Sequence, residues 1–266
     1  MATGDARSTP ATPGTAEFRF YEELNDFLQP RLRKSAFPIA IDRGRSVKDA
    51  VESAGVPHTE IDLILVDGVS VGFGHVLFGG ERVAVYPVFE RLDIAPLQHL
   101  RPAPLRDPRF VIDTHLGKLA RHLRLAGFDS LWRNDYDDAD IVALAVAERR
   151  IVLTRDCGLL KRSAVERGHF VHATNAELQL TEVIRVFQLD AMLRPFSRCR
   201  ECNVVLVDAD KAEVSDRLPE KVRKFYDRYR RCPGCGRIYW EGTHYERLRG
   251  MLARATHFPI FHGRPG

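Results

Sequence analysis

The amino-acid sequence indicates an α/β protein in three parts: a small α+β domain, a core built on a parallel sheet, and a cysteine-rich end. Three observations support this division. Strand patterns gather around a single helix in the first third of the chain, whereas strands and helices alternate in the middle. Two Cys-x-x-Cys pairs follow near the end. At 266 residues, the chain is long enough for such a division.

Composition is typical of a soluble globular protein, with 44% hydrophobic and 29% charged residues. No apolar run reaches the roughly 18 residues that a membrane-spanning helix needs. Residues 1–16 are rich in Thr, Pro, Ala and Gly and lack the apolar segment of a secretory signal, so we predict a disordered tail there. We therefore expect a cytoplasmic protein with no membrane partner.

Charge is distributed unevenly along the chain. Net charge is −4 over residues 17–96, near zero over 97–190 and +7 over 191–266. A basic segment suits a polyanion such as a nucleic acid. A solvated surface remains the alternative.

Residues 17–96 are expected to form one α+β domain. A short amphipathic helix is indicated between Ser46, a good N-cap residue, and the stop at Gly55. Strand patterns precede and follow this helix. They cover residues 18–21, 37–41, 61–66, 69–71 and 82–88. The order ββαβββ describes a β-grasp domain.

Three motifs of this domain resemble the ubiquitin-like sulfur carriers of thiamine and molybdopterin synthesis: V-K-D-A-V-E-x-x-G, the V-D-G turn and G-E-R-V-A-V-Y-P. Those carriers act through a free C-terminal Gly-Gly, whereas Gly79-Gly80 is internal and the chain continues beyond it. A domain of this kind could serve sulfur-transfer chemistry on RNA, but the internal position of Gly79-Gly80 disfavours that role here. We interpret the domain as a binding or positioning module, with a protein as its candidate partner.

A proline-rich linker is predicted over residues 97–107, and a parallel α/β core over residues 108–192. Strand and helix patterns alternate through the core. Strands are expected at 109–113, 128–132, 151–154 and 169–172, and helices at 114–126, 138–149, around 159–162 and at 174–189. A capping box from Thr174 to Glu177 is expected to open the last helix.

Three aspartates follow strands or begin a helix of this core. Asp113 ends the first strand, Asp156 follows the third, and Asp138 begins a helix. If the two strands are neighbours in an open parallel sheet, these positions meet at its carboxyl edge. Convergent carboxylates require a cation, and hard oxygen ligands favour Mg²⁺ or Mn²⁺. Such a site can activate water for phosphodiester hydrolysis.

Structural roles for the same acids stay open. Asp113 and Asp138 could each cap a helix, and Asp156 could pair with a neighbouring arginine. Asp140 could take the place of Asp138.

Four cysteines form two closely spaced pairs, Cys199 with Cys202 and Cys232 with Cys235. In a cytosolic protein such pairs indicate tetrahedral zinc rather than disulfides. We predict a zinc ribbon and a C-terminal helix over residues 193–255. Two unrelated redox or buried pairs are the alternative.

Several motifs resemble the Mut-seven C-terminal RNase domain family, which has a PIN-like nuclease fold with a zinc ribbon. They are F-V-I-D-x-x-L-G-K-L-A-R-H-L-R-L-A-G-F-D, D-A-D-I-V-A-L-A, R-I-V-L-T-R-D, S-R-C-x-x-C-N, C-P-G-C-G-R-I-Y-W and G-T-H-Y. The resemblance runs from about residue 109 to 248 and implies a metal-dependent ribonuclease. By position, Asp113, Asp138 and Asp156 match the acids of the family.

A β-grasp module precedes the nuclease domain in many bacterial members, which agrees with residues 17–96. One departure is the missing counterpart of the glutamate that PIN toxins carry in a middle helix. The number of catalytic metal ions therefore stays open.

Basic residues suited to RNA fall in two groups. Lys118, Arg121 and Arg155 lie near the proposed carboxylate edge. Lys221, Arg223 and Lys224 lie in a stretch, residues 221–231, where cations alternate with aromatic rings suited to unpaired RNA. Solvated helix faces, and inward packing of the aromatic residues, are the alternatives.

The sequence therefore favours a metal-dependent ribonuclease that hydrolyses RNA phosphodiester bonds, with Mg²⁺ or Mn²⁺ at the carboxylates and structural zinc at the cysteines. The rival interpretation is an RNA-binding adaptor whose PIN-like core is catalytically idle.

Overall fold

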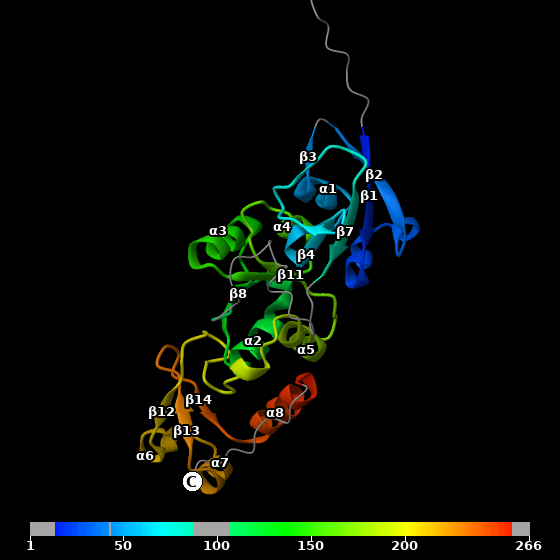
Figure 1. The fold of residues 1–266 in the computed structure, drawn as a ribbon. Helices are drawn as coiled ribbons and strands as arrows, with labels where there is room; N and C mark the ends of the chain where they lie inside the picture. Colours follow the sequence, from blue (N-terminus) through cyan, green and yellow to red (C-terminus); the bar gives the residue numbers. More distant parts are fainter. Residues whose placement is uncertain (1–13, 43, 88–106, 257–266) are drawn as a thin grey trace, which may run out of the picture. The chain divides into compact units, whose positions relative to one another are not determined.

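The computed structural model describes residues 14–42, 44–87 and 107–256, in two compact units that divide at residue 104. Figure 1 shows the chain coloured along the sequence. Most of the tail predicted over 1–16, and all but Asp107 of the linker predicted over 97–107, lie outside the described residues. None of the described helices is long and apolar enough to cross a membrane.

The first unit is a β-grasp sheet, as predicted. Strands run in the order β2-β1-β7-β4-β5, with β1 and β7 parallel at the centre. The elements are β1 (Gly14–Phe20), β2 (Ala36–Ile41), β3 (Arg45–Ser46), α1 (Val47–Ser53), β4 (Leu63–Val66), β5 (Val69–Ser70), β6 (Val76–Leu77) and β7 (Arg82–Tyr86). The Ser46 side chain accepts a hydrogen bond from the N–H of Asp49, so it caps α1 as expected.

The first strand begins at Gly14, so residues 14–16 are part of the sheet rather than of a disordered tail. Burial alternates along β1, with Ala16, Phe18 and Phe20 in the core. Gly14 packs against the turn before β7, where a Cβ on Gly79 would lie 2.7 Å from the Gly14 Cα. Gly79 has a φ of +103°, so close packing and backbone conformation both require glycine there.

The second unit is built on a four-stranded parallel sheet in the order β11-β10-β8-β9. Its strands are β8 (Arg109–Ile112), β9 (Asp129–Leu131), β10 (Ile151–Thr154) and β11 (Gly168–Phe170). Helices α2 (Gly117–Ala126), α5 (Ala176–Val186) and α8 (Thr243–Ala255) pack in the same hydrophobic core as Phe110. Helices α3 (Asp138–Glu148) and α4 (Cys157–Leu160) form a second core with Val111. Successive strand residues thus face opposite layers, as a doubly covered parallel sheet requires.

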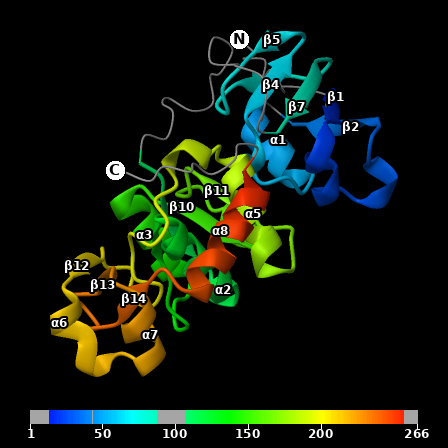
Figure 2. The same cartoon turned by 90° about the horizontal axis from the view of Figure 1, so that it is seen from below.

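Two details of this unit differ from the sequence analysis. The C-terminal helix, which we grouped with the zinc ribbon, packs on α2 and α5 because Leu248, Met251 and Leu252 are buried in the core of the sheet domain (Figure 2). The N-cap of α5 is Asn175 rather than Thr174, since the Asn175 side chain accepts the N–H groups of Glu177 and Leu178.

The cysteine-rich segment forms a small antiparallel sheet of β12 (Val207–Ala209), β13 (Tyr229–Arg231) and β14 (Ile238–Trp240). Two short helices, α6 (Lys211–Val214) and α7 (Glu220–Phe225), lie between β12 and β13. Val214, Leu218 and Tyr229 make a separate small core beneath them. So small a core leaves the segment in need of another source of stability, such as a metal ion.

Candidate active site and metal centre

Asp113 and Asp156 meet at the carboxyl edge of the parallel sheet. Their strands, β8 and β10, are direct neighbours, with Ile112 paired to Leu153. The Thr154 hydroxyl donates to Asp113 Oδ2 at 2.6 Å and accepts the backbone N–H of Asp156 at 2.9 Å. Thr154 therefore ties the Asp113 carboxylate to the residue that carries the second acid. The sequence analysis did not single out this threonine, although it stands directly before Arg155-Asp156.

Asp138 stands at the first position of α3, but it does not cap the helix. Asp137 is the N-cap, and Asp140 completes a reciprocal capping box with it. Asp138 Oδ2 instead lies 3.1 Å from an amino group of Arg162, and both side chains are about half exposed. Asp140 is committed to the cap and is a weaker substitute for Asp138 than the sequence suggested.

The oxygen donors at this edge are of the right type for Mg²⁺ or Mn²⁺, which binds one or two carboxylates and keeps several waters. The structure does not gather all three acids: among the described residues, the four-cysteine group is the one cluster of three or more ligand side chains close enough for one ion. Asp156 also caps α4, because its Oδ1 accepts the N–H of Gly158 at 2.6 Å. Asp113 and Asp156 thus share the carboxyl edge of the sheet, linked through Thr154, whereas Asp138 is engaged with Arg162.

A basic groove of about 920 Å³ opens beside this edge, between α2, the start of α5, and α8. His115, two residues after Asp113, contributes to one end. Four cationic side chains line the groove, namely Lys118, Arg121, Arg200 and Arg247. Positive charge next to a carboxylate edge suits a phosphate chain that approaches a bound cation.

Arg121 is held in the groove by two neighbours. Its guanidinium carbon lies 5.8 Å from the centre of the Trp132 ring, and its Nε is 3.5 Å from Glu201 Oε2. The Trp132 Nε1–H donates to the carbonyl of Thr114 at 3.1 Å, just after Asp113. Trp132 thus links the Arg121 side of the groove to the carboxylate edge. Sequence analysis missed this role, although Trp132 ends a predicted strand.

The Trp132 ring also packs directly on Gly117, the first residue of α2. A Cβ at this position would lie 2.5 Å from the ring. We expect Gly117→Ala to displace Trp132 and lower the free energy of unfolding by about 1–3 kcal/mol, which urea denaturation measures. Gly74→Ala is the matched control, because a Cβ there meets nothing within 4 Å. Equal stability of the two variants would contradict this packing.

Arg155 holds the loop that follows β11. Its guanidinium donates to the carbonyl oxygens of His172 and Ala173, at 3.1 and 2.8 Å. The carboxylate of Glu182 accepts the N–H groups of the same two residues. Burial tends to raise the pKa of Glu182, but these bonds and the contact with His169 outweigh it and hold the pKa below its usual value. Arg155 is therefore a support of this loop in addition to being a predicted RNA contact.

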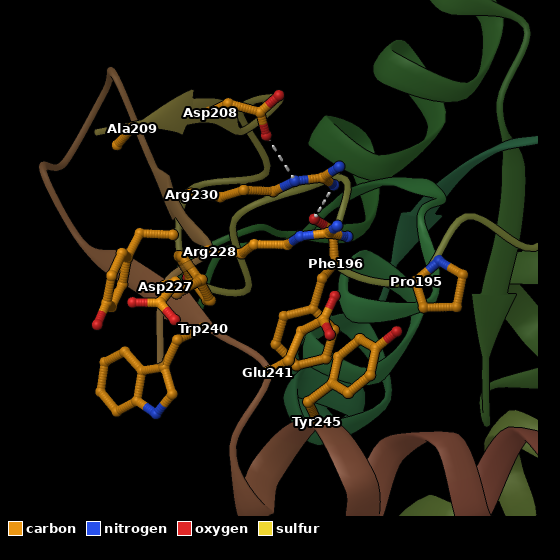
Figure 3. A pocket seen from close by; sticks show the side chains of 12 residues that line it. Pro195, Phe196, Asp208, Ala209, Asp227, Arg228, Arg230, Trp240, Glu241 and Tyr245 are labelled. Carbon is orange, nitrogen blue, oxygen red and sulfur yellow. Dashed lines mark hydrogen bonds and ion pairs between the residues drawn. The ribbon is translucent and has the colours of Figure 1, made fainter. Parts of the chain in front are cut away.

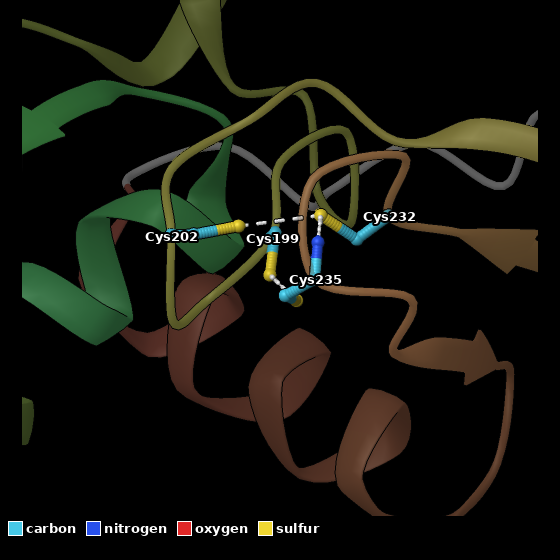
Figure 4. Close-up of side chains that lie close together, drawn as sticks. All are labelled: Cys199, Cys202, Cys232 and Cys235. Atoms are coloured by element: carbon cyan, nitrogen blue, oxygen red, sulfur yellow. Dashed lines mark hydrogen bonds between the residues drawn. The ribbon is translucent and has the colours of Figure 1, made fainter.

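The four cysteines are brought together as predicted. Their Sγ atoms all lie within 4.8 Å of one another (Figure 4), and such a group could bind zinc. Burial opposes ionisation of Cys199, but the Tyr239 hydroxyl and nearby backbone N–H groups lower the pKa of its thiol to about 6, whereas burial and the neighbouring thiols raise the pKa of Cys202 and of Cys235. A thiolate is the form that a metal ion requires.

The first cysteine pair is anchored to the core of the sheet domain. Arg124 on α2 is 3% exposed, and its guanidinium donates to the carbonyls of Ser130, Arg200 and Glu201. Asn203 adds hydrogen bonds to the backbone of Ser130 and to the side chain of Asp129. Arg200 and Glu201 lie between Cys199 and Cys202, and Arg200 lines the basic groove.

The basic stretch over 221–231 divides into exposed and packed parts. Lys221, Arg223 and Lys224 are exposed on α7. Phe225 is 71% exposed, whereas Tyr226 and Tyr229 pack in the small core of the ribbon. Inward packing therefore accounts for two of the three aromatic residues.

Comparisons with known proteins identify both parts of the chain. A family model described as Mut7-C RNAse domain matches residues 108–252, and one described as Mut7-C ubiquitin matches residues 14–93. Two crystal structures of the small archaeal modifier protein 1 of Haloferax volcanii are similar, at 18% and 19% identity. They cover 28% of this chain and 97% and 94% of theirs, each with a TM-score of 0.23. No curated protein matches the chain.

Proposed function

The chain belongs to the Mut7-C RNAse domain family, and we propose that it is a ribonuclease that hydrolyses RNA phosphodiester bonds with the help of Mg²⁺ or Mn²⁺. One observation carries the proposal beyond the family: Thr154 joins Asp113 to Asp156 at the carboxyl ends of two neighbouring parallel strands. Ligand sites of open parallel sheets lie at this edge.

Asp113 and Asp156 would hold the ion, and Asp138 would join them by exchanging its contact with Arg162. The bound ion supplies an activated water and neutralises charge that develops on the phosphate. Side chains of the protein orient the carboxylates and bind the substrate. Thr154 orients Asp113, while Lys118 and Arg121 bind phosphates in the basic groove. Arg155, Lys221, Arg223 and Lys224 are additional candidate RNA contacts.

Zinc at Cys199, Cys202, Cys232 and Cys235 has a structural role in this proposal. Four thiolates complete a tetrahedral site and leave no position for substrate. The ubiquitin-like domain is assigned to binding a protein partner.

The rival proposal is an RNA-binding adaptor with an idle core. The observations that favour it are the cap that Asp156 provides to α4 and the ion pair between Asp138 and Arg162, because both engage acids that catalysis needs. The two proposals differ in one expectation: the nuclease cleaves RNA in the presence of a suitable divalent metal ion, and the adaptor does not.

The test is cleavage of end-labelled single-stranded and hairpin RNA by the full chain, with Mg²⁺, with Mn²⁺ or with EDTA. We expect cleavage with either ion, none in EDTA, and recovery when excess Mg²⁺ is returned. The zinc content of each sample is measured as well. If cleavage returns with Mg²⁺ while zinc has been retained throughout, the loss in EDTA is due to the carboxylate site and not to the cysteines. RNA binding without cleavage in either ion would replace the nuclease by the adaptor.

A further inference from the structure

A second pocket lies on the ribbon, away from the carboxylate edge. It has a volume of about 500 Å³, which is within the usual range for small-ligand sites, and it opens between the ribbon sheet and the start of α8. Figure 3 shows its lining, which includes the rings of Phe196, Trp240 and Tyr245. Aromatic surfaces of this kind stack bases that are not paired in a duplex.

The charged groups of this pocket fall into two sets. Arg230 is paired with Asp208 at 3.1 Å, and Asp227 is paired with Lys211 at 2.7 Å. In contrast, the side chains of Arg228 and Glu241 have no hydrogen-bond or ion-pair partner within the described part of the chain. The pocket thus offers one guanidinium donor and one carboxylate acceptor that are available to a ligand.

Two aromatic residues add polar groups to this set. Neither the Trp240 Nε1–H nor the Tyr245 hydroxyl has a hydrogen-bond partner among residues 107–256. Burial and the nearby charge of Glu241 raise the pKa of Tyr245, so its hydroxyl keeps its proton. These groups can donate to a carbonyl or ring nitrogen of a ligand while the aromatic faces contact its ring.

From this arrangement we propose that the ribbon pocket binds an unpaired guanine base of the RNA. Guanine is the RNA base that presents two adjacent N–H donors on its pairing edge, and a single carboxylate accepts both. Glu241 is that carboxylate. The Arg228 guanidinium supplies donors for the guanine O6 and N7, and the rings of Phe196 and Tyr245 form the apolar wall.

The inference rests on the proposed RNA substrate, but it concerns recognition at a place separate from the bond that is cut. In this inference the ribbon recognises one specific base of the RNA and also contributes Arg200 to the basic groove.

The test is equilibrium binding of fluorescent single strands of about 12 nucleotides to the full-length Asp113→Asn protein, which keeps RNA intact. The strands are all-uridine except for one central guanosine, inosine or uridine. Inosine lacks the 2-amino group of guanine but keeps N1–H and O6. We expect the guanosine strand to bind about tenfold more tightly than the inosine strand, because one charge-assisted hydrogen bond is lost.

Glu241→Gln is expected to abolish this preference for guanosine over inosine. The matched control is Glu246→Gln, which removes the same charge from an exposed side chain of α8 that pairs with Arg249 and does not line the pocket. Both variants will change general RNA affinity, so the ratio between strands is the readout. A ratio that survives Glu241→Gln, or equal binding of all three strands by the parent, overturns the inference.

The outcomes also separate this inference from the proposed catalysis. Metal-dependent cleavage by the unsubstituted protein without any guanine preference overturns the pocket assignment alone. A guanine preference that depends on Glu241, with no cleavage in Mg²⁺ or Mn²⁺, supports the pocket and overturns the nuclease.

Discussion

Asp113→Asn is expected to reduce RNA cleavage about a thousandfold, because several kcal/mol of metal-dependent stabilisation of the transition state are lost. The fold should remain intact. Asp113 accepts hydrogen bonds from the hydroxyls of Thr154 and Thr114, and the amide oxygen of Asn can still accept one of them. Initial rates on labelled RNA and the midpoint of urea denaturation, measured on the same preparation, separate a catalytic effect from a structural one.

Asp107→Asn is the control for this substitution. Asp107 is exposed and lies just before the amino end of β8, whereas Asp113 follows the carboxyl end of the same strand. Both substitutions remove one negative charge, so a difference in cleavage rate between the two variants reports the role of Asp113 at the carboxyl edge. If the two variants cut RNA at similar rates, the catalytic site has been misplaced.

Asp156→Asn extends the same prediction to the second acid and tests the adaptor alternative. The amide oxygen of Asn can still cap α4 by accepting the N–H of Gly158, so a purely structural Asp156 should tolerate the change. A loss of cleavage at unchanged stability therefore assigns Asp156 to the metal rather than to the helix.

The sequence was sufficient to predict the parallel sheet and the carboxylate edge because both depend on local patterns. Alternating strand and helix periodicity placed Asp113 and Asp156 at strand ends, and parallel pairing brings such ends together. The cysteine spacing likewise predicted the cluster of four thiols. Each of these inferences needs only the order of elements and the residue at one end of an element.

The basic groove could not be predicted in the same way because it depends on long-range packing. Trp132 follows β9, Arg200 lies in the loop of the first cysteine pair, and Arg247 lies on the C-terminal helix. These residues meet because α8 returns to pack on α2 and α5, and helical periodicity does not reveal which core a helix joins. The capping box of α3 also escaped prediction: the sequence analysis considered Asp138 as the cap, whereas Asp137 and Asp140 form it.

Loss of zinc should affect RNA binding as well as stability, because Arg200, which lines the groove, lies in the loop of the first cysteine pair. We expect Cys232→Ser to reduce the zinc content below one ion per chain and to lower the melting temperature by about 10 °C or more. Structural zinc contributes free energy comparable to the whole stability of a domain, and the small core of the ribbon offers little replacement. Elemental analysis and thermal denaturation measure the two effects.

Cys157→Ser is the matched control, since Cys157 is half-buried on α4 and lies outside the cluster. It should retain zinc and the parental melting temperature. Retention of both by Cys232→Ser as well would exclude the four-cysteine group as a structural metal site.

The effect on RNA follows from the anchoring of the first pair. Zinc constrains the loop between Cys199 and Cys202. Without it, the carbonyl oxygens of the loop lose their alignment with Arg124, and the Glu201 carboxylate loses its alignment with Arg121. Arg121 and Arg200 then no longer present a fixed pair of charges to phosphates. Because each phosphate contact on a single strand contributes about 0.7 to the slope of log affinity against log salt, loss of both should flatten the slope by about 1.4. An unchanged slope in zinc-depleted protein would show that the groove binds RNA independently of the ribbon.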